Sequence, residues 1–242
     1  MNSRHQYHKY LGYYENIIQH EKCLNYKGKE QEFIIKTFNT MVNRTFYLSR
    51  AISILYETGL HEEVAILTRS LLEIMFKLGY MLNDKEKTYS RVSNFLSNNN
   101  YKKGLLEDMK NMNLPLPYEE GRNMVIEEKS DILDLLEIGE DQLDKENRVI
   151  EMAKELGFLS VYSYYYRHFS QYVHSTAYVF QTNDDSGRNK LGERSIICCT
   201  FCWLILSEMI NEYFELNKKK EIRKLSREYR QFYRVKSKND SI

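Results

Sequence analysis

The sequence contains little glycine and proline, with ten glycines and two prolines in 242 residues. Together they make up about 5% of the chain, against roughly 12% in ordinary globular proteins. β-sandwiches, barrels and propellers need such turn residues every few positions, so these folds are not expected. Because 42% of the residues are hydrophobic, the chain has enough apolar side chains for a core. We therefore expect an all-α fold, a single helical bundle of long helices with few connections.

Long hydrophobic runs are also absent. The longest, at 196–206, spans 11 residues, whereas a membrane span needs about 20. The first residues contain no continuous apolar segment of the kind found in secretory leaders. We expect a buried helix at 196–206, no membrane span and a cytoplasmic protein.

The chain has four cysteines, and three of them, Cys198, Cys199 and Cys202, lie within this apolar run. The Cys199–Cys202 pair has no second pair and no nearby histidine, so it lacks a zinc ligand set. We interpret the three as small core side chains in a reducing compartment. The sequence also lacks Glu-x-x-His pairs and glycine-rich phosphate loops, so we expect neither a metal nor a cofactor.

Hydrophobic periodicity predicts the main helices. They are expected over 4–26, 30–56, 61–82, 160–181 and 191–216, with weaker helices over 84–113 and 119–155. The clearest is 61–82, whose apolar residues step by three and four as in a bundle seam: Val64, Leu67, Leu71, Ile74, Leu78 and Met81. Loops are expected at 114–117, which holds both prolines, and at 182–190.

Charge is unevenly distributed along the chain. Residues 217–238 hold ten Lys/Arg and two Glu, whereas 119–155 hold 13 Asp/Glu and 5 Lys/Arg. We therefore divide the chain into a bundle over 1–216 and a basic C-terminal tail over 217–242. On a helix, four arginines of the tail share one face: Arg223, Arg227, Arg230 and Arg234. Interleaved with aromatics, they suit a nucleic-acid backbone. The alternatives are pairing with the acidic segment, in the same or a partner subunit, and an anionic membrane surface.

A polar stripe follows the expected helix 160–181. At 100° per residue, the stripe contains Arg167, Gln171, His174 and Tyr178. Arg167 and His174 are two turns apart, about 10 Å along the axis, so their long side chains can converge on one phosphate-sized group. His168 and Ser175 form a second polar pair beside the stripe, and Ser170 is a further supporting residue.

Two charged residues, Arg69 and Glu73, interrupt the apolar helix 61–82 one turn apart. Such a pair can be simple helix support. Within a hydrophobic helix we expect it to meet a polar group on a neighbouring helix, with Arg167 and His174 as candidates. This would form either a structural network or a preorganised site.

The spacing Arg167-His168-x5-His174 resembles the R-x(4–6)-H motif of the HEPN superfamily of all-helical bundles. The segments AILTRSLLEIMFKLGYML and YYRHFSQYVHS also resemble a bacterial helical family of unknown function. Together the resemblances cover about residues 40–215. Many HEPN motifs open a helix, whereas Arg167 is expected one or two turns inside one.

The HEPN resemblance implies metal-independent cleavage of RNA, tRNA among the candidates, by a homodimer whose two motifs meet. His174 would be the general acid or base at the ribose 2′-OH, and Arg167 would hold the scissile phosphate. The reaction would be a transesterification that leaves a 2′,3′-cyclic phosphate, with His168 orienting the site. Such families commonly act as toxins, abortive-infection effectors or antiphage components, with an antitoxin or defence-system partner protein.

Two alternatives remain for the same residues. The chain can be a non-catalytic HEPN-like module that binds a nucleotide or a partner protein. It can also be an unrelated structural bundle in which Arg167 and His174 pair with carboxylates, since buried charges require partners.

Overall fold

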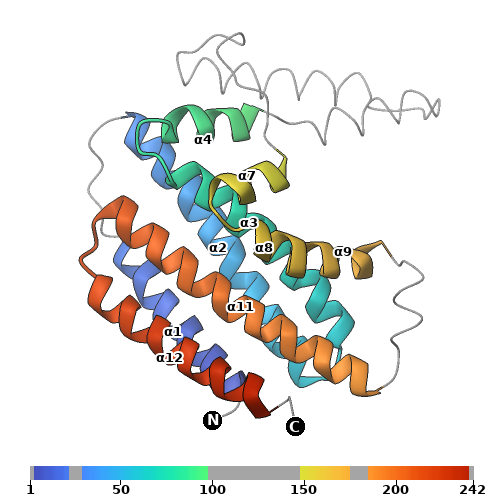
Figure 1. The fold of residues 1–242 in the computed structure, drawn as a ribbon. Coiled ribbons are helices and arrows are strands. Elements are labelled where there is room, and N and C mark those ends of the chain that lie inside the picture. Colours follow the sequence, from blue (N-terminus) through green and yellow to red (C-terminus); the bar gives the residue numbers. More distant parts are fainter. Residues whose placement is uncertain (1–2, 22–28, 98–147, 175–184, 240–242) are drawn as a thin grey trace, which may run out of the picture.

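The computed structural model describes residues 3–21, 29–97, 148–174 and 185–239. These residues form helices without any strand, so the all-α prediction is confirmed (Figure 1). In chain order the elements are α1 (Ser3–Glu21), α2 (Lys29–Glu57), α3 (His61–Leu82), α4 (Thr88–Ser97), α7 (Val149–Glu155), α8 (Leu159–Val161), the π-helical turn η2 (Tyr162–Tyr166), α9 (Arg167–Val173), α11 (Asp185–Phe214) and α12 (Lys219–Asn239).

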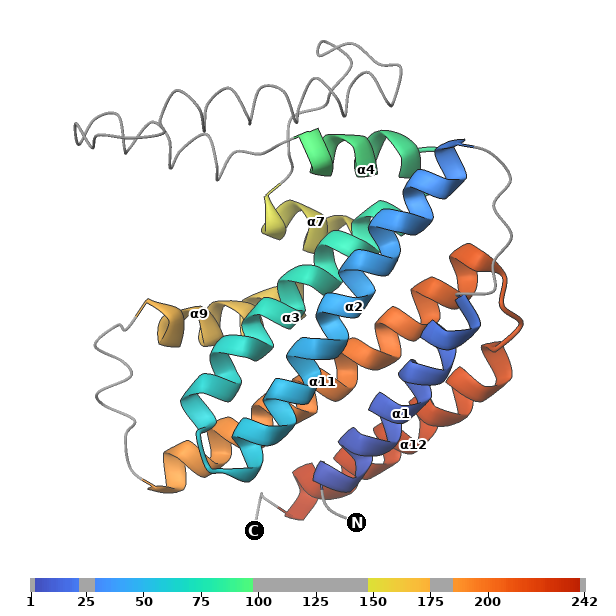
Figure 2. The ribbon, with the colours of Figure 1, turned by 180° about the vertical axis from the view of Figure 1, so that it is seen from behind.

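Helix α11 lies at the centre of the bundle. It packs against α3 on one side and against α1 on the other, and α3 packs in turn against α2. Helix α12 lies along the outer side of α1 and α11. On the side of α11 that faces away from α12, η2 and α9 cross α3 (Figures 1 and 2). The long helices therefore form a frame to which the short elements α7 to α9 attach.

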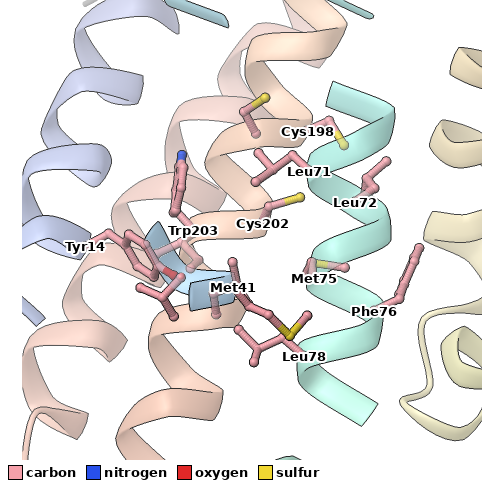
Figure 3. Packing of buried hydrophobic residues seen from close by; sticks show 14 of the residues in the cluster. Tyr14, Met41, Leu71, Leu72, Met75, Phe76, Leu78, Cys198, Cys202 and Trp203 are labelled. Carbon is pink, nitrogen blue, oxygen red and sulfur yellow. The ribbon is translucent and has the colours of Figure 1, made fainter. Parts of the chain in front are cut away.

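The core is built where α3 meets α11 (Figure 3). Along the predicted seam of α3, Leu71 and Leu78 are fully buried, whereas Leu67 and Ile74 are only partly buried. The buried face is wider than the seam and also holds Leu72, Met75 and Phe76. A wider face is needed because α3 is covered by α2 as well as by α11.

Trp203 of α11 anchors the other side of the core. Its side chain is fully buried, and its ring lies 4.3 Å from that of Tyr14 on α1, measured between centroids. The predicted core role of Cys198, Cys199 and Cys202 is confirmed, because all three are fully buried. Burial raises the pKa of the Cys198 and Cys199 thiols, which keeps both protonated. Cys23 lies outside the described residues.

Helix α11 is longer than the sequence pattern predicts. It begins at Asp185, so the predicted loop over 182–190 is wrong from that residue onward. Residues 186–190 extend beyond the core and are mostly exposed, so they need no apolar periodicity to be helical. Gly192 allows a close approach here, because a Cβ at this position would lie 2.3 Å from Nδ1 of His61.

By length and composition, the segment Ser186–Phe214 of α11 could cross a membrane. Its most apolar 18-residue window is 67% buried inside the bundle. The other helices account for this burial, since α11 packs against α1, α3 and α12.

Helix α12 is attached to the bundle through its apolar side. Ile222 and Leu225 are buried, and the Tyr10 hydroxyl donates to the Leu225 carbonyl oxygen at 2.9 Å. Lys9 of α1 pairs with Glu228. These contacts join the basic segment to α1, and the Tyr229 hydroxyl joins it to α11 by donating to the Ile197 carbonyl oxygen. Residues 119–147 of the acidic segment lie outside the described residues.

Removal of a core side chain tests this packing. Leu71→Ala should lower the free energy of unfolding by about 2–5 kcal/mol, because it leaves a cavity between α3 and α11. Ile54→Ala removes the same number of carbons from a side chain that is 62% exposed, so it should change stability by less than about 0.5 kcal/mol. Urea unfolding measures both. Equal losses would contradict a core at this contact.

Candidate functional site

A π-helical turn interrupts the helix that carries the predicted site. The backbone N–H of Arg167 bonds to the carbonyl oxygen of Tyr162, five residues earlier. Such single-turn insertions occur frequently at functional sites, since they redirect the side chains that surround them. Sequence periodicity predicts one regular helix over 160–181. The structure instead has α8, η2 and α9, with α9 ending at Val173.

A pocket of about 320 Å³ opens beside this turn. It is lined by residues of three elements: Ser163, Tyr164 and Tyr165 of η2, Arg167, His168 and Gln171 of α9, and Arg194 of α11. Three residues predicted from the stripe and its flank, Arg167, His168 and Gln171, are therefore brought together.

The pocket is positively charged. Arg167 and Arg194 are exposed, and neither forms an ion pair with any described residue. His168 is half-buried, and its pKa is lowered first by burial and then by the nearby charge of Arg194. No lining residue is a carboxylate. Two cations and a neutral imidazole thus face solvent in a site suited to an anion.

Tyrosines form the aromatic side of the pocket. The Tyr164 ring is 59% exposed and meets the ring of Tyr165 edge to face, with centroids 4.8 Å apart. Burial raises the pKa of Tyr165, so its hydroxyl stays neutral. An exposed ring beside two cations can stack on a planar ligand.

A polar network on α3 holds the last residue of the π turn in place. The Arg69 Nη2 donates to the Tyr166 hydroxyl at 2.7 Å, and that hydroxyl donates to Glu73 Oε2 at 3.3 Å. The Arg69 and Glu73 side chains pair at 2.9 Å, and Lys77 pairs with Glu73 at 3.1 Å. Burial and the Glu73 charge raise the pKa of Tyr166 to about 12. The Arg69 guanidinium also lies 4.8 Å from the centre of the Tyr166 ring.

The expectation that Arg69 and Glu73 meet a polar group on a neighbouring helix is therefore correct, but the partner is Tyr166. Arg167 and His174, the candidates from the sequence, form no hydrogen bond or ion pair with this pair within the described ranges. The reason is the π turn, which directs Tyr166 toward α3 and leaves Arg167 exposed.

The remaining predicted residues are placed differently. His174 caps the C-terminus of α9, is exposed and does not line the pocket. The Ser170 hydroxyl donates to the Tyr166 carbonyl oxygen, four residues earlier, at 2.7 Å, so it is used in a hydrogen bond to the backbone of the preceding turn. Tyr178 and the side chain of Arg234 lie outside the described residues, while Arg223, Arg227 and Arg230 are exposed on α12.

Sequence analysis missed Arg194. Arg194 lies between the predicted loop, which ends at residue 190, and the apolar run, which begins at Ile196. A usable signal was its position as the last cation before that run. No set of three or more His, Cys, Asp or Glu side chains suited to a metal ion occurs in the described part of the chain.

The Tyr166 network predicts a stability effect. Tyr166→Phe should lower the free energy of unfolding by about 1–2 kcal/mol, because Arg69 and Glu73 lose a partly buried hydrogen-bond partner. Tyr164→Phe removes the same atom from an exposed ring and is the matched control. Chemical denaturation measures the unfolding midpoints of both variants. Equal unfolding midpoints would show that the hydroxyl does not hold the turn.

The charge of Arg194 predicts a shift at His168. Arg194→Gln should raise the pKa of His168 toward its ordinary value near 6.5, because one of the two causes that lower the pKa is removed. Arg50→Gln, on α2, should leave this pKa unchanged. An NMR titration of the ring proton measures both, with His168→Gln assigning the signal.

The same shift makes folding depend on pH. The unfolded chain binds the His168 proton more tightly than the folded chain does. The stability that neutral His168 contributes is therefore present above pH 6.5 and is lost as pH falls below that value. If the pKa of His168 were the same in the Arg194→Gln variant as in the unmodified protein, this electrostatic account would be contradicted.

Comparison with protein families gives a match to a described family. Residues 36–189 match a family of unknown function, DUF5677. The matched range contains the Arg69–Glu73 pair and the segment from Arg167 to His174. Neither the curated proteins nor the solved structures give a match. Because the match covers more than half of the chain, the protein belongs to the DUF5677 family.

Proposed function

We propose that this protein is a metal-independent endoribonuclease of the HEPN type, with Arg167 at its centre. The observation that supports the proposal is the open pocket in which Arg167, His168 and Arg194 meet without a carboxylate. Guanidinium groups in such a setting bind phosphate and stabilise the charge that develops on its oxygens.

The proposed reaction needs only the RNA and protein side chains. The ribose 2′-oxygen attacks the adjacent phosphorus, and a general base takes the 2′-OH proton. The bond from phosphorus to the 5′-oxygen breaks, and a general acid protonates that oxygen. The products are a 2′,3′-cyclic phosphate and a 5′-hydroxyl. His174 is proposed for the proton transfers, since an imidazole has one nitrogen that can accept a proton and, once protonated, can donate it.

A homodimer would bring a second motif to the site. His174 lies at the exposed end of α9, beside Val173, an apolar side chain that is 38% exposed. An imidazole at that position is available to a site shared with a second copy of the chain. We propose that the composite site pairs the two motifs in this way.

Helix α12 is proposed to bind the RNA backbone. Its apolar side is used in contacts with α1 and α11, so Arg223, Arg227 and Arg230 are left on the exposed side. None of the three forms an ion pair with another residue of the described ranges. Arg234 continues the same spacing in the sequence. An unneutralised basic face of this kind supports contact with RNA, tRNA among the candidates.

The biological setting is proposed from the HEPN resemblance. It would be that of a cytoplasmic toxin, abortive-infection effector or antiphage component, controlled by an antitoxin or a defence-system partner protein.

A second candidate function is a non-catalytic module that binds a nucleotide or a partner protein. The observation that favours it is the position of His174, which does not line the pocket that holds Arg167. In this case the pocket would bind its anion without any proton transfer.

Cleavage of total tRNA in the presence of EDTA tests the proposal. The unmodified protein should cleave, Arg167→Ala should lose about 10²–10³-fold in rate, and His174→Ala about 10²–10⁴-fold. The matched controls are Arg50→Ala and His8→Ala, which change exposed residues paired with Glu15 and Glu57 away from the pocket. RNA binding without cleavage would favour the module, and cleavage that survives both motif substitutions would contradict the proposed site.

A further inference from the structure

Arg194 is a cation that the HEPN-type motif does not include. It lies on α11, whereas Arg167 and His168 lie on α9, and all three line the same pocket. Its charge acts at this pocket, because it lowers the pKa of His168 and opposes the upward shift at Tyr165. The core packing of α11 fixes the backbone that carries it.

The two arginines in the pocket are not neutralised by the protein. Neither forms an ion pair within the described ranges, although Arg69 and Arg91 elsewhere in the bundle each pair with a glutamate. Like charges around one pocket repel each other, so a bound anion offsets the electrostatic repulsion between the two guanidinium groups. Guanidinium is suited to phosphate, because its planar fork donates two parallel hydrogen bonds.

The pocket also has a size and an aromatic surface that point to a particular ligand. Ligand sites in proteins range over about 300–1,000 Å³, and this pocket, at about 320 Å³, lies at the lower end. It therefore has room for one nucleotide unit. The exposed ring of Tyr164 is placed in the lining where a base can stack.

We infer that Arg194 is a second phosphate-binding residue, and that the pocket takes one nucleotide unit of an RNA strand, with its phosphate at Arg167 and Arg194 and its base on Tyr164. The inference rests on the proposed function for the identity of the strand. Beyond that function, the inference assigns a role to Arg194 and a class of ligand to the pocket. A phosphate in this place could belong to an RNA chain or to a free nucleotide, and the experiment separates the two.

Binding of a 2′-O-methyl RNA oligonucleotide tests the role without cleavage, since this strand lacks the attacking hydroxyl. Fluorescence anisotropy over a series of salt concentrations gives the Kd and its salt dependence. Arg194→Gln should weaken binding about tenfold or more and should reduce the slope of log K against log salt by about 0.7, the value for one phosphate contact on a single strand. Arg194→Lys keeps the charge but not the fork, so it should recover the slope and only part of the affinity.

Arg50→Gln, which changes an exposed arginine on α2, should bind as the unmodified protein does. Thermal unfolding of each variant checks that the fold is kept. If Arg194→Gln binds the oligonucleotide with unchanged Kd and slope while Arg167→Gln binds weakly, the role of Arg194 is overturned and the proposed function stands.

Adenosine 5′-monophosphate provides the second arm. If it binds in an Arg194-dependent manner while RNA is neither bound nor cleaved, the phosphate role of Arg194 stands and the ribonuclease proposal fails. If neither ligand binds the unmodified protein, the inference is overturned.

Discussion

The packing of α3 against α11 is the contact on which the rest of the structure depends. Leu71 on α3 and Cys198 on α11 are both fully buried. Both helices also carry charged side chains beside their buried faces. Arg194 of the pocket lies on α11 between buried Leu191 and Ile196, and the charged residues that hold the π turn lie on α3. A single apolar contact therefore sets the relative position of the two halves of the pocket.

The polar network on α3 fixes the position of the pocket relative to the long helices. Tyr166 is bonded to Arg69 and Glu73, so the end of the π turn is fixed against α3. The next residue, Arg167, must then lie on the outer side of the helix. The charged groups of the network form ion pairs with one another, whereas the two arginines of the pocket form none within the described ranges. This difference separates a structural group of charges from one that is available to a ligand.

The sequence predicted the parts of the fold that follow from apolar periodicity. Helix α3 was predicted to its first and last residue, and the buried cysteines followed from the apolar run around them. The start of α11 was not predicted, because its first residues extend past the core and carry no apolar pattern. The π turn was not predicted either, since one inserted residue leaves no mark in the composition of YSYYY.

For the candidate site, sequence reasoning found Arg167, His168 and Gln171 on one helix but missed Arg194. Residues of one helix are related by spacing, whereas a residue on another helix reaches the pocket only through tertiary packing. For the same reason the partner of Arg69 was expected among the motif residues and was found one position before them, at Tyr166.

The central claim is that the pocket around Arg167 serves transesterification at an RNA phosphate. The most direct test is mass spectrometry of the RNA ends after incubation with the unmodified protein in EDTA. The account predicts 2′,3′-cyclic phosphate and 5′-hydroxyl ends. Fragments that end in a 3′-hydroxyl and a 5′-phosphate would contradict it, because those products require attack by water instead of the ribose hydroxyl.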